Sequence, residues 1–207
     1  MPNLAPTKIV CVGRNYAAHA KELGNDVPKE PLLFLKPPSS LIRSGESIRL
    51  PTVSNRVEYE GEIGVVIGRR LRKASPADAR AAIANVFAAN DVTARDLQKS
   101  DVQFTRAKGF DTFCAVGELG EVPDDLSQLR VRTLVNGQVR QDGQASDMVF
   151  DIPTLVSFIS GVMTLESGDL ILTGTPAGVG TLVDGDVVEV EIAGVSRVSN
   201  PVTSDNL

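Results

Sequence analysis

The segment VEYEGEIGVVIG, residues 57–68, constrains the fold more than any other part of the chain. Its apolar residues are typical of a buried β-strand, but Glu58, Glu60 and Glu62 stand at alternate positions within it. Because side chains alternate between the two faces of a strand, all three carboxylates are expected on one face. A solvated face explains such a row, since ionised groups are costly to bury. The alternative is a face that binds a cation.

Length and charge limit the class of protein. With 207 residues, the chain can bury the core of one domain. A net charge of −5 and the lack of a Lys/Arg cluster argue against nucleic acid as a partner, and the basic residues at 69–73 are expected in a solvated turn. We find no leader, no membrane-length apolar run and no disulfide framework in the two cysteines, so a cytoplasmic protein without a membrane partner is expected.

In the first half of the chain, short elements alternate with loops. A strand is predicted over 7–13 and a short helix over 14–23, whereas prolines in residues 25–47 predict loops and short strands. Ser75 and Pro76 are typical of a helix start, and the alanine-rich stretch that follows predicts a helix over 79–89.

In the second half, β structure predominates. Asn136-Gly137 predicts a hairpin within residues 131–143, and Asp151 and Pro153 predict the start of a helix over 152–163. The tail from 169 to 198 alternates apolar strands with glycine-rich turns. The predicted pattern is mixed, with more strands than helices and no regular βαβ series.

Several common catalytic motifs are missing from the sequence. A single histidine excludes a His-rich zinc site and an HExxH motif. No GxxxxGK(S/T) phosphate loop, GxGxxG or GxSxG segment occurs, which removes sequence support for a nucleotide enzyme or an α/β-hydrolase. The remaining candidates are mainly carboxylates.

Glu60 and Glu62 are candidate metal ligands if they face inward. Asp91, expected in a loop after the 79–89 helix, is the candidate for a third carboxylate, although an Asp at such a junction is also typical of a cap or turn. An oxygen-only ligand set selects a hard ion, so Mg²⁺ or Mn²⁺ is expected rather than zinc.

Three further features allow a catalytic and a structural interpretation. His19 and Glu22 share a helix face, either as a base held by a carboxylate or as an ordinary surface pair. Lys108 is either a solvated loop lysine or a cation near a developing oxyanion. The loop TGTPAGVG, residues 173–180, suits an anionic ligand, to which the Thr175 hydroxyl would donate, or a tight turn between strands.

Five segments in order carry a resemblance to a known family: VGRNYAAHAKE, EYEGEIGVVIG, NDVTARDLQ, AKGFDTF and GDLILTGTPAGVG. Together they resemble the fumarylacetoacetate hydrolase family, from about residue 8 to residue 202. The resemblance implies one catalytic domain, residues 1–207, with the family's α+β fold: large mixed β-sheets rolled into a sandwich-like core with a few short helices. It also implies a homodimer and a lid over residues 14–30.

The same resemblance implies roles for individual residues. Glu60, Glu62 and Asp91 would hold Mg²⁺ or Mn²⁺, with Glu58 outside the ligand set. The implied catalytic residues are His19, Glu22 and Lys108, and the implied substrate contacts are Arg14, Arg95, Gln98 and Thr175. Phe104, Ala115 and Ser196 depart from residues common in the family, which affects the expected substrate preference more than the chemistry.

The implied function is metal-dependent cleavage of a C–C bond in a small 2-oxo acid. Hydrolysis of an acylpyruvate, such as acetylpyruvate or fumarylpyruvate, is expected to lead, with oxaloacetate decarboxylation in the same site. One alternative is isomerisation or decarboxylation of unsaturated 2-oxo dicarboxylates, as in 2-hydroxyhepta-2,4-diene-1,7-dioate isomerase. A non-catalytic, metal-stabilised interaction module is the alternative of another class, and it would not use the His19, Glu22 and Lys108 set.

Overall fold

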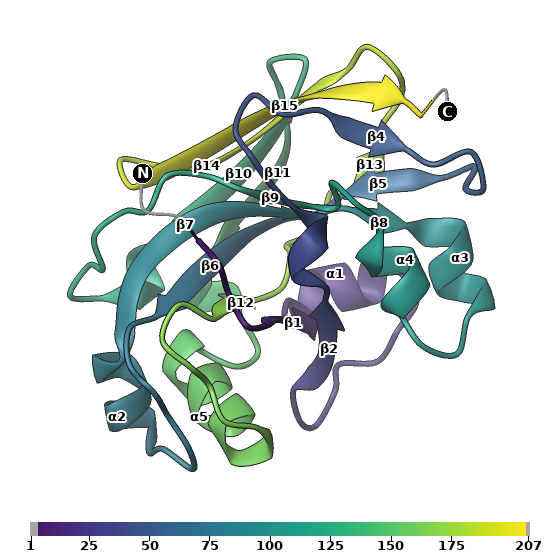
Figure 1. Cartoon of the computed structure of the whole chain (residues 1–207). Helices are drawn as coiled ribbons and strands as arrows, with labels where there is room; N and C mark the ends of the chain where they lie inside the picture. Colours follow the sequence, from purple (N-terminus) through teal and green to yellow (C-terminus); the bar gives the residue numbers. More distant parts are fainter. Residues whose placement is uncertain (1–3, 206–207) are drawn as a thin grey trace.

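The computed structural model describes residues 4–205, which form three β-sheets with short helices around them (Figure 1). The largest sheet has seven strands in the order β2-β1-β12-β6-β7-β9-β3. Their bounds are β1 (Ile9–Gly13), β2 (Leu32–Lys36), β3 (Leu41–Arg43), β6 (Gly61–Ile67), β7 (Ile83–Asp91), β9 (Cys114–Val116) and β12 (Leu170–Leu172). Parallel and antiparallel pairs both occur, which confirms the predicted α+β class with mixed sheets.

A second sheet of five strands packs across β6, β7 and β9. Its strands, in the order β11-β10-β14-β15-β4, are β4 (Ile48–Leu50), β10 (Arg130–Val135), β11 (Gln138–Gln144), β14 (Val187–Ile192) and β15 (Ser196–Ser204). A small third sheet joins β5 (Val57–Tyr59), β8 (Thr93–Ala94) and β13 (Gly180–Thr181). The predicted hairpin is confirmed, because β10 and β11 pair through Asn136 and Gly137, both with positive φ.

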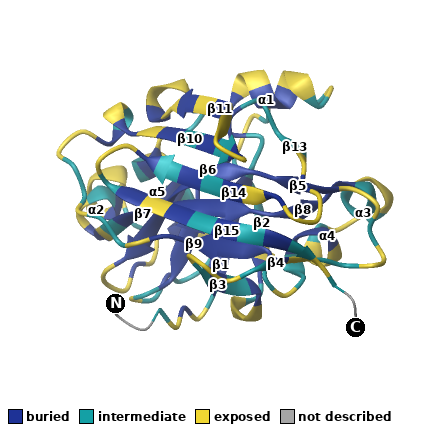
Figure 2. Ribbon diagram, turned by 90° about the horizontal axis from the view of Figure 1, so that it is seen from above, coloured by how far each residue is buried: buried dark blue, intermediate teal, exposed yellow. Residues whose placement is uncertain are grey.

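The helices are short and lie around the sheets. They are α1 (Ala17–Glu22), α2 (Pro76–Ala81), α3 (Arg95–Ser100), α4 (Thr105–Gly109) and α5 (Ile152–Val162), with single 3₁₀ turns η1 (Pro38–Ser40), η2 (Leu126–Gln128) and η3 (Ala145–Asp147). Asp151 caps α5 as predicted, by accepting the Thr154 N–H. Within residues 4–205, every helix is too short or too polar to cross a bilayer. Figure 2 shows buried residues along the central strands and exposed ones mainly on the surrounding helices and loops.

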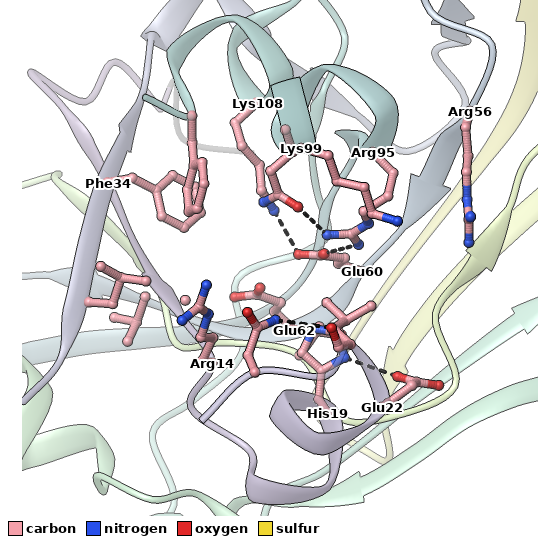
Figure 3. A pocket seen from close by; sticks show the side chains of 18 residues that line it. Arg14, His19, Glu22, Phe34, Arg56, Glu60, Glu62, Arg95, Lys99 and Lys108 are labelled. Atoms are coloured by element: carbon pink, nitrogen blue, oxygen red, sulfur yellow. Dashed lines mark hydrogen bonds and ion pairs between the residues drawn. The ribbon is translucent and has the colours of Figure 1, made fainter. Parts of the chain in front are cut away.

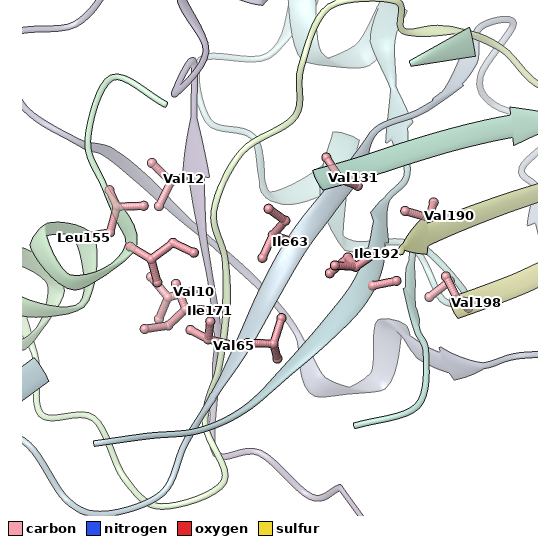
Figure 4. Close-up of a cluster of buried hydrophobic side chains, with 14 of the residues drawn as sticks. Val10, Val12, Ile63, Val65, Val131, Leu155, Ile171, Val190, Ile192 and Val198 are labelled. Atoms are coloured by element: carbon pink, nitrogen blue, oxygen red, sulfur yellow. The ribbon is translucent and has the colours of Figure 1, made fainter. Parts of the chain in front are cut away.

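The two faces of the large sheet carry different side chains. Ile63 and Val65 of β6 pack with Val131 and Val190 of the second sheet (Figure 4), and each such buried side chain contributes about 1.5–3 kcal/mol relative to an exposed one. A second apolar cluster occupies the opposite face: Ile9, Cys11, Val66, Phe87, Ala89, Cys114, Val116, Leu170 and Leu172. By strand alternation, Glu62 and Asp91 fall on the face of this second cluster, whereas Gly61 and Asn90 fall on the face toward the second sheet.

The helix predicted over 79–89 is wrong beyond Ala81. Ser75 does cap α2, but residues 83–91 form β7 in the large sheet, between β6 and β9. Ala88 and Ala89 belong to the clusters on opposite faces of this strand, where both faces are covered and space is small. Close packing between two layers therefore overrides the helical preference of the alanines. As a result, Asp91 ends a strand and does not follow a helix.

The segment 57–68 is two strands, not one. It breaks at Glu60, so that β5 joins the third sheet and β6 the large sheet. The break separates Glu58 from the other two carboxylates: Glu58 accepts hydrogen bonds from Arg56 Nε at 2.6 Å and from Arg95 Nε at 2.7 Å. The expected single row of three carboxylates on one face is therefore not formed.

Candidate active site

Three buried carboxylates meet where β6 and β7 lie side by side. Ligand oxygens of Glu60, Glu62 and Asp91 all lie within 4.8 Å of one another. The antiparallel pairing of the two strands sets this arrangement, since Gly61 is opposite Asn90 and the Asp91 N–H donates to Glu60 O at 2.8 Å. The structure thus brings together the three side chains that the sequence predicted as metal ligands.

Three buried cations surround this cluster. Lys108 Nζ lies 2.6 Å from Glu60 Oε2 and 2.8 Å from Asp91 Oδ2, and Lys36 Nζ lies 2.6 Å from Asp91 Oδ1. Arg95 pairs with Glu60 and with Glu58. Glu60 and Asp91 are therefore paired with buried cations, whereas Glu62 forms no ion pair within residues 4–205.

The pKa values of the cluster reflect this difference. Burial alone would raise the pKa of Glu60, but Lys108 and Arg95 hold it below its usual range. Burial, then the charges of Asp91 and Glu60, raise the pKa of Glu62 well above its usual value. Burial would lower the pKa of Lys108, but Asp91 and Glu60 raise it, so this amine stays protonated and is a cation rather than a base.

The cluster fits a hard divalent cation. Within residues 4–205, the only hydrogen bond that Glu62 accepts is from the Gly174 N–H, at 2.7 Å, so its charge has no bonded cation. A divalent ion beside Glu60, Glu62 and Asp91 would compensate the charge of Glu62, and an oxygen-only set is the kind that such ions prefer. The donor set and its charge therefore fit the metal implied by the sequence.

Lys36 is a member of this cluster that the sequence analysis missed. Its side chain is fully buried, and its amine also donates to Val92 O at 3.2 Å. The signal was a single charged residue at the end of the apolar run LLFLK, residues 32–36, now strand β2. Lys36 does not line the cleft, so its amine contacts Asp91 within the protein interior and not from the cleft.

Replacing Lys36 with Met should lower the free energy of unfolding by about 3 kcal/mol, because breaking a buried ion pair leaves a charge without its partner. Denaturant unfolding in EDTA measures this change. Lys29→Met, at an exposed lysine, is the control and should stay within about 0.5 kcal/mol of the wild type. Equal stability of both variants would show that Lys36 does not compensate Asp91.

Helix α1 carries the predicted dyad and closes over the carboxylates. His19 is 4 % exposed, and its Nδ1 lies 3.1 Å from Glu22 Oε2. The other oxygen of Glu22 accepts the Gly178 N–H at 3.0 Å, which docks the helix on the loop at 173–180. Arg14 and Gly24, on either side of α1, have positive φ. A contact between α1 and this loop thus holds the dyad in place.

The site is a cleft of about 430 Å³, of the size of small-molecule sites (Figure 3). The predicted residues that line it are Arg14, His19, Glu22, Glu60, Glu62, Arg95, Gln98, Lys108 and Thr175. Lys108 comes from α4, in a stretch for which the sequence predicted neither helix nor strand. Phe104 forms part of the wall, edge-on to Phe34 with ring centroids 5.7 Å apart, so this departure from the family lies where a substrate would make contact.

The Thr175 hydroxyl is oriented differently from the prediction. It donates to Gly61 O at 2.8 Å and accepts from Gln141 Nε2 at 2.7 Å. A hydroxyl has one proton, so it is not free to donate to an anion in the cleft as expected. Gln141 does not stand out in the sequence, because β11 reads QVRQDGQ and most of its residues are polar.

Comparison with known proteins identifies the family. The sequence pattern described as "Fumarylacetoacetate (FAA) hydrolase C-terminal" matches residues 8–203. The chain belongs to the fumarylacetoacetate hydrolase family. Its similarity to members of this family extends over most of their length, as two curated sequences and one solved structure illustrate.

The chain is 46 % identical to "Oxaloacetate tautomerase FAHD1, mitochondrial" of Arabidopsis thaliana, over 93 % of this chain and 89 % of the relative. It is 44 % identical to "Oxaloacetate decarboxylase, mitochondrial" of Dictyostelium discoideum, over 91 % and 89 %. The crystal structure of 2-hydroxyhepta-2,4-diene-1,7-dioate isomerase from Mycobacterium marinum matches with a TM-score of 0.90 and 46 % identity, over 99 % of this chain and 77 % of that one. Family members of this fold thus carry the names of decarboxylases, tautomerases and isomerases.

Proposed function

We propose that the protein is a Mg²⁺- or Mn²⁺-dependent enzyme that cleaves a C–C bond in small 2-oxo acids. One observation carries the proposal: Glu60, Glu62 and Lys108 line a cleft that also contains the His19–Glu22 dyad, and the fully buried Asp91 lies beside the two glutamates. A non-catalytic module has no use for a buried base and a buried cation next to a metal site. The homodimer predicted from the sequence stays a prediction.

Each group of the cleft has a role in this reaction. Glu60, Glu62 and Asp91 would hold the ion, which when bound stabilises negative charge on the 2-oxo oxygen of the substrate. With the Nδ1 proton held by Glu22, the Nε2 lone pair of His19 can take a proton from water, as hydrolysis of an acylpyruvate requires. Lys108, as a cation, stabilises a developing oxyanion.

The charges of the cleft support an anionic substrate. Arg14 and Lys99 both line it, and neither forms an ion pair with another residue between 4 and 205. The names of the relatives support oxaloacetate, a dicarboxylate, beside the acylpyruvates. Isomerisation of an unsaturated 2-oxo dicarboxylate is the second candidate, supported by the name of the M. marinum structure.

Purified protein with Mn²⁺ or Mg²⁺ should convert acetylpyruvate or oxaloacetate, and excess EDTA should abolish this turnover. The reason is that Lys108 is already paired with Glu60 and Asp91, so without the ion the charge of an enolate is left uncompensated. Loss of each substrate can be followed by absorbance, with the uncatalysed metal reaction as the blank. Metal-independent turnover would contradict the proposal, and inertness toward both substrates would favour the isomerase.

A further inference from the structure

The backbone that carries Glu60 and Glu62 is held by side chains from three other segments. The Glu60 N–H donates to Asn90 Oδ1 at 3.0 Å, and the Gly61 N–H donates to Gln141 Oε1 at 2.9 Å. Gly61 O accepts from the Thr175 hydroxyl at 2.8 Å. In a continuous sheet, these backbone groups would pair with the backbone of a neighbouring strand. At the break between β5 and β6, side chains are their hydrogen-bond partners.

Gln141 forms hydrogen bonds to both the carboxylate strand β6 and the loop at 173–180. Its amide also donates to Thr175 Oγ1 at 2.7 Å and to Pro176 O at 2.8 Å, so every hydrogen of the amide is used and its oxygen is bonded. It is 1 % exposed, whereas its neighbours Arg140 and Asp142 are exposed. This one inward-facing side chain of β11 therefore ties the second sheet to the carboxylate strand and to the loop at 173–180.

The packing leaves this strand little freedom. A Cβ on Gly61 would lie 1.9 Å from Thr133 Oγ1 and 3.2 Å from Gln141 Oε1, so the strand and the second sheet are in direct contact. Asn90 Nδ2 is buried without a hydrogen-bond partner in residues 4–205. An unpaired buried donor costs stability. The Asn90 side chain bears this cost while its amide oxygen accepts the Glu60 N–H and so fixes the backbone there.

We propose that Gln141 is a positioning residue that, from the second sheet, sets the spacing of the Glu60 and Glu62 carboxylates. It touches neither the carboxylates nor the interior of the cleft, and it acts through the Gly61 backbone and through Thr175. Without its amide, the buried Gly61 N–H and Pro176 O lose their partners, and the strand must shift to find others. A shift of this strand moves both carboxylates relative to Asp91. The inference rests on the proposed metal site.

The test is calorimetric titration of the full chain with Mn²⁺, without substrate. Gln141→Met should raise the Kd at least tenfold, the size expected when a group that orients metal ligands is removed. Gln138→Met is the matched control: it makes the same substitution on the same strand, at an exposed position whose side-chain hydrogen bond, within the described residues, is with Arg140. Its Kd should stay within twofold of the wild type.

Thr175→Val, which removes the hydroxyl between Gln141 and Gly61 O, should raise the Kd at least threefold, and it tests the network even if Gln141→Met does not fold. Combined with Gln141→Met, it should add little, because both act through one network. An unchanged Kd in Gln141→Met, or in Thr175→Val if only that variant folds, would overturn the inference, as would an equal change in Gln138→Met. Wild-type protein that binds no Mn²⁺ would instead overturn the proposed function.

Discussion

Glu62→Gln should abolish Mn²⁺ binding and lower turnover about a thousandfold, while the metal-free protein becomes more stable. The amide keeps the shape of the side chain, and its oxygen can still accept the Gly174 N–H. The substitution removes one of the three negative charges that would bind the ion. Without the ion, the transition state loses several kcal/mol of charge stabilisation, which corresponds to about three powers of ten in rate. Calorimetry and steady-state kinetics measure the two losses.

The gain in stability follows from the pKa of Glu62. Burial and the charges of Asp91 and Glu60 raise it in the folded protein above the ordinary value of 4.5, so ionisation opposes folding. The metal-free wild type should lose stability as the pH rises from the ordinary value through the raised one, and the variant should lack this loss. At pH 7 the metal-free variant should therefore be more stable than the metal-free wild type.

Denaturant unfolding in EDTA at several pH values measures this gain. Glu121→Gln, which removes an exposed carboxylate, is the control and should leave metal affinity and stability unchanged. If Glu62→Gln still bound Mn²⁺ with wild-type affinity, Glu62 would not be a ligand. If it were instead less stable without metal, the carboxylate would be stabilising the fold.

His19→Ala should lower hydrolysis of acetylpyruvate about a thousandfold at saturating Mn²⁺, within the range for loss of a general base. Its Mn²⁺ affinity should be unchanged, because the proposed ligands are three carboxylates and His19 is hydrogen-bonded to Glu22, which is not one of them. Oxaloacetate decarboxylation should fall less, since cleavage of that bond needs no activated water. Comparing kcat for the two substrates separates these roles.

Two further variants test the dyad. Lys21→Ala, at an exposed position on the same helix, should keep wild-type kcat. Glu22→Gln can still accept the Gly178 N–H, but its amide donor beside His19 Nδ1 favours the tautomer with the proton on Nε2, so it should lose most of the activity. Unchanged hydrolysis in His19→Ala would remove the base from the mechanism.

Sequence reasoning succeeded where the relevant interactions are local. The caps at Ser75 and Asp151 and the turn at Asn136-Gly137 depend on residues a few positions apart, and all formed as predicted. The helix over 79–89 failed because strand β7 is buried between two layers, a circumstance that alanine propensity does not contain. Asp91 was predicted as a ligand on two grounds, its place after that helix and the family resemblance; the first ground fails with the helix, and the second does not depend on secondary structure.

The sequence by itself determined the family, the α+β class, and the acids, the dyad and the lysine of the candidate site, because these are carried by short motifs in a fixed order. Only the tertiary structure decided how they are held. It broke the carboxylate strand at Glu60, turned Glu58 toward Arg95, and brought in Lys36 and Gln141. Lys36 lies 55 positions from Asp91 and Gln141 lies 80 positions from Gly61, and contacts at such separations arise from the packing of whole sheets, which no local pattern of residues encodes.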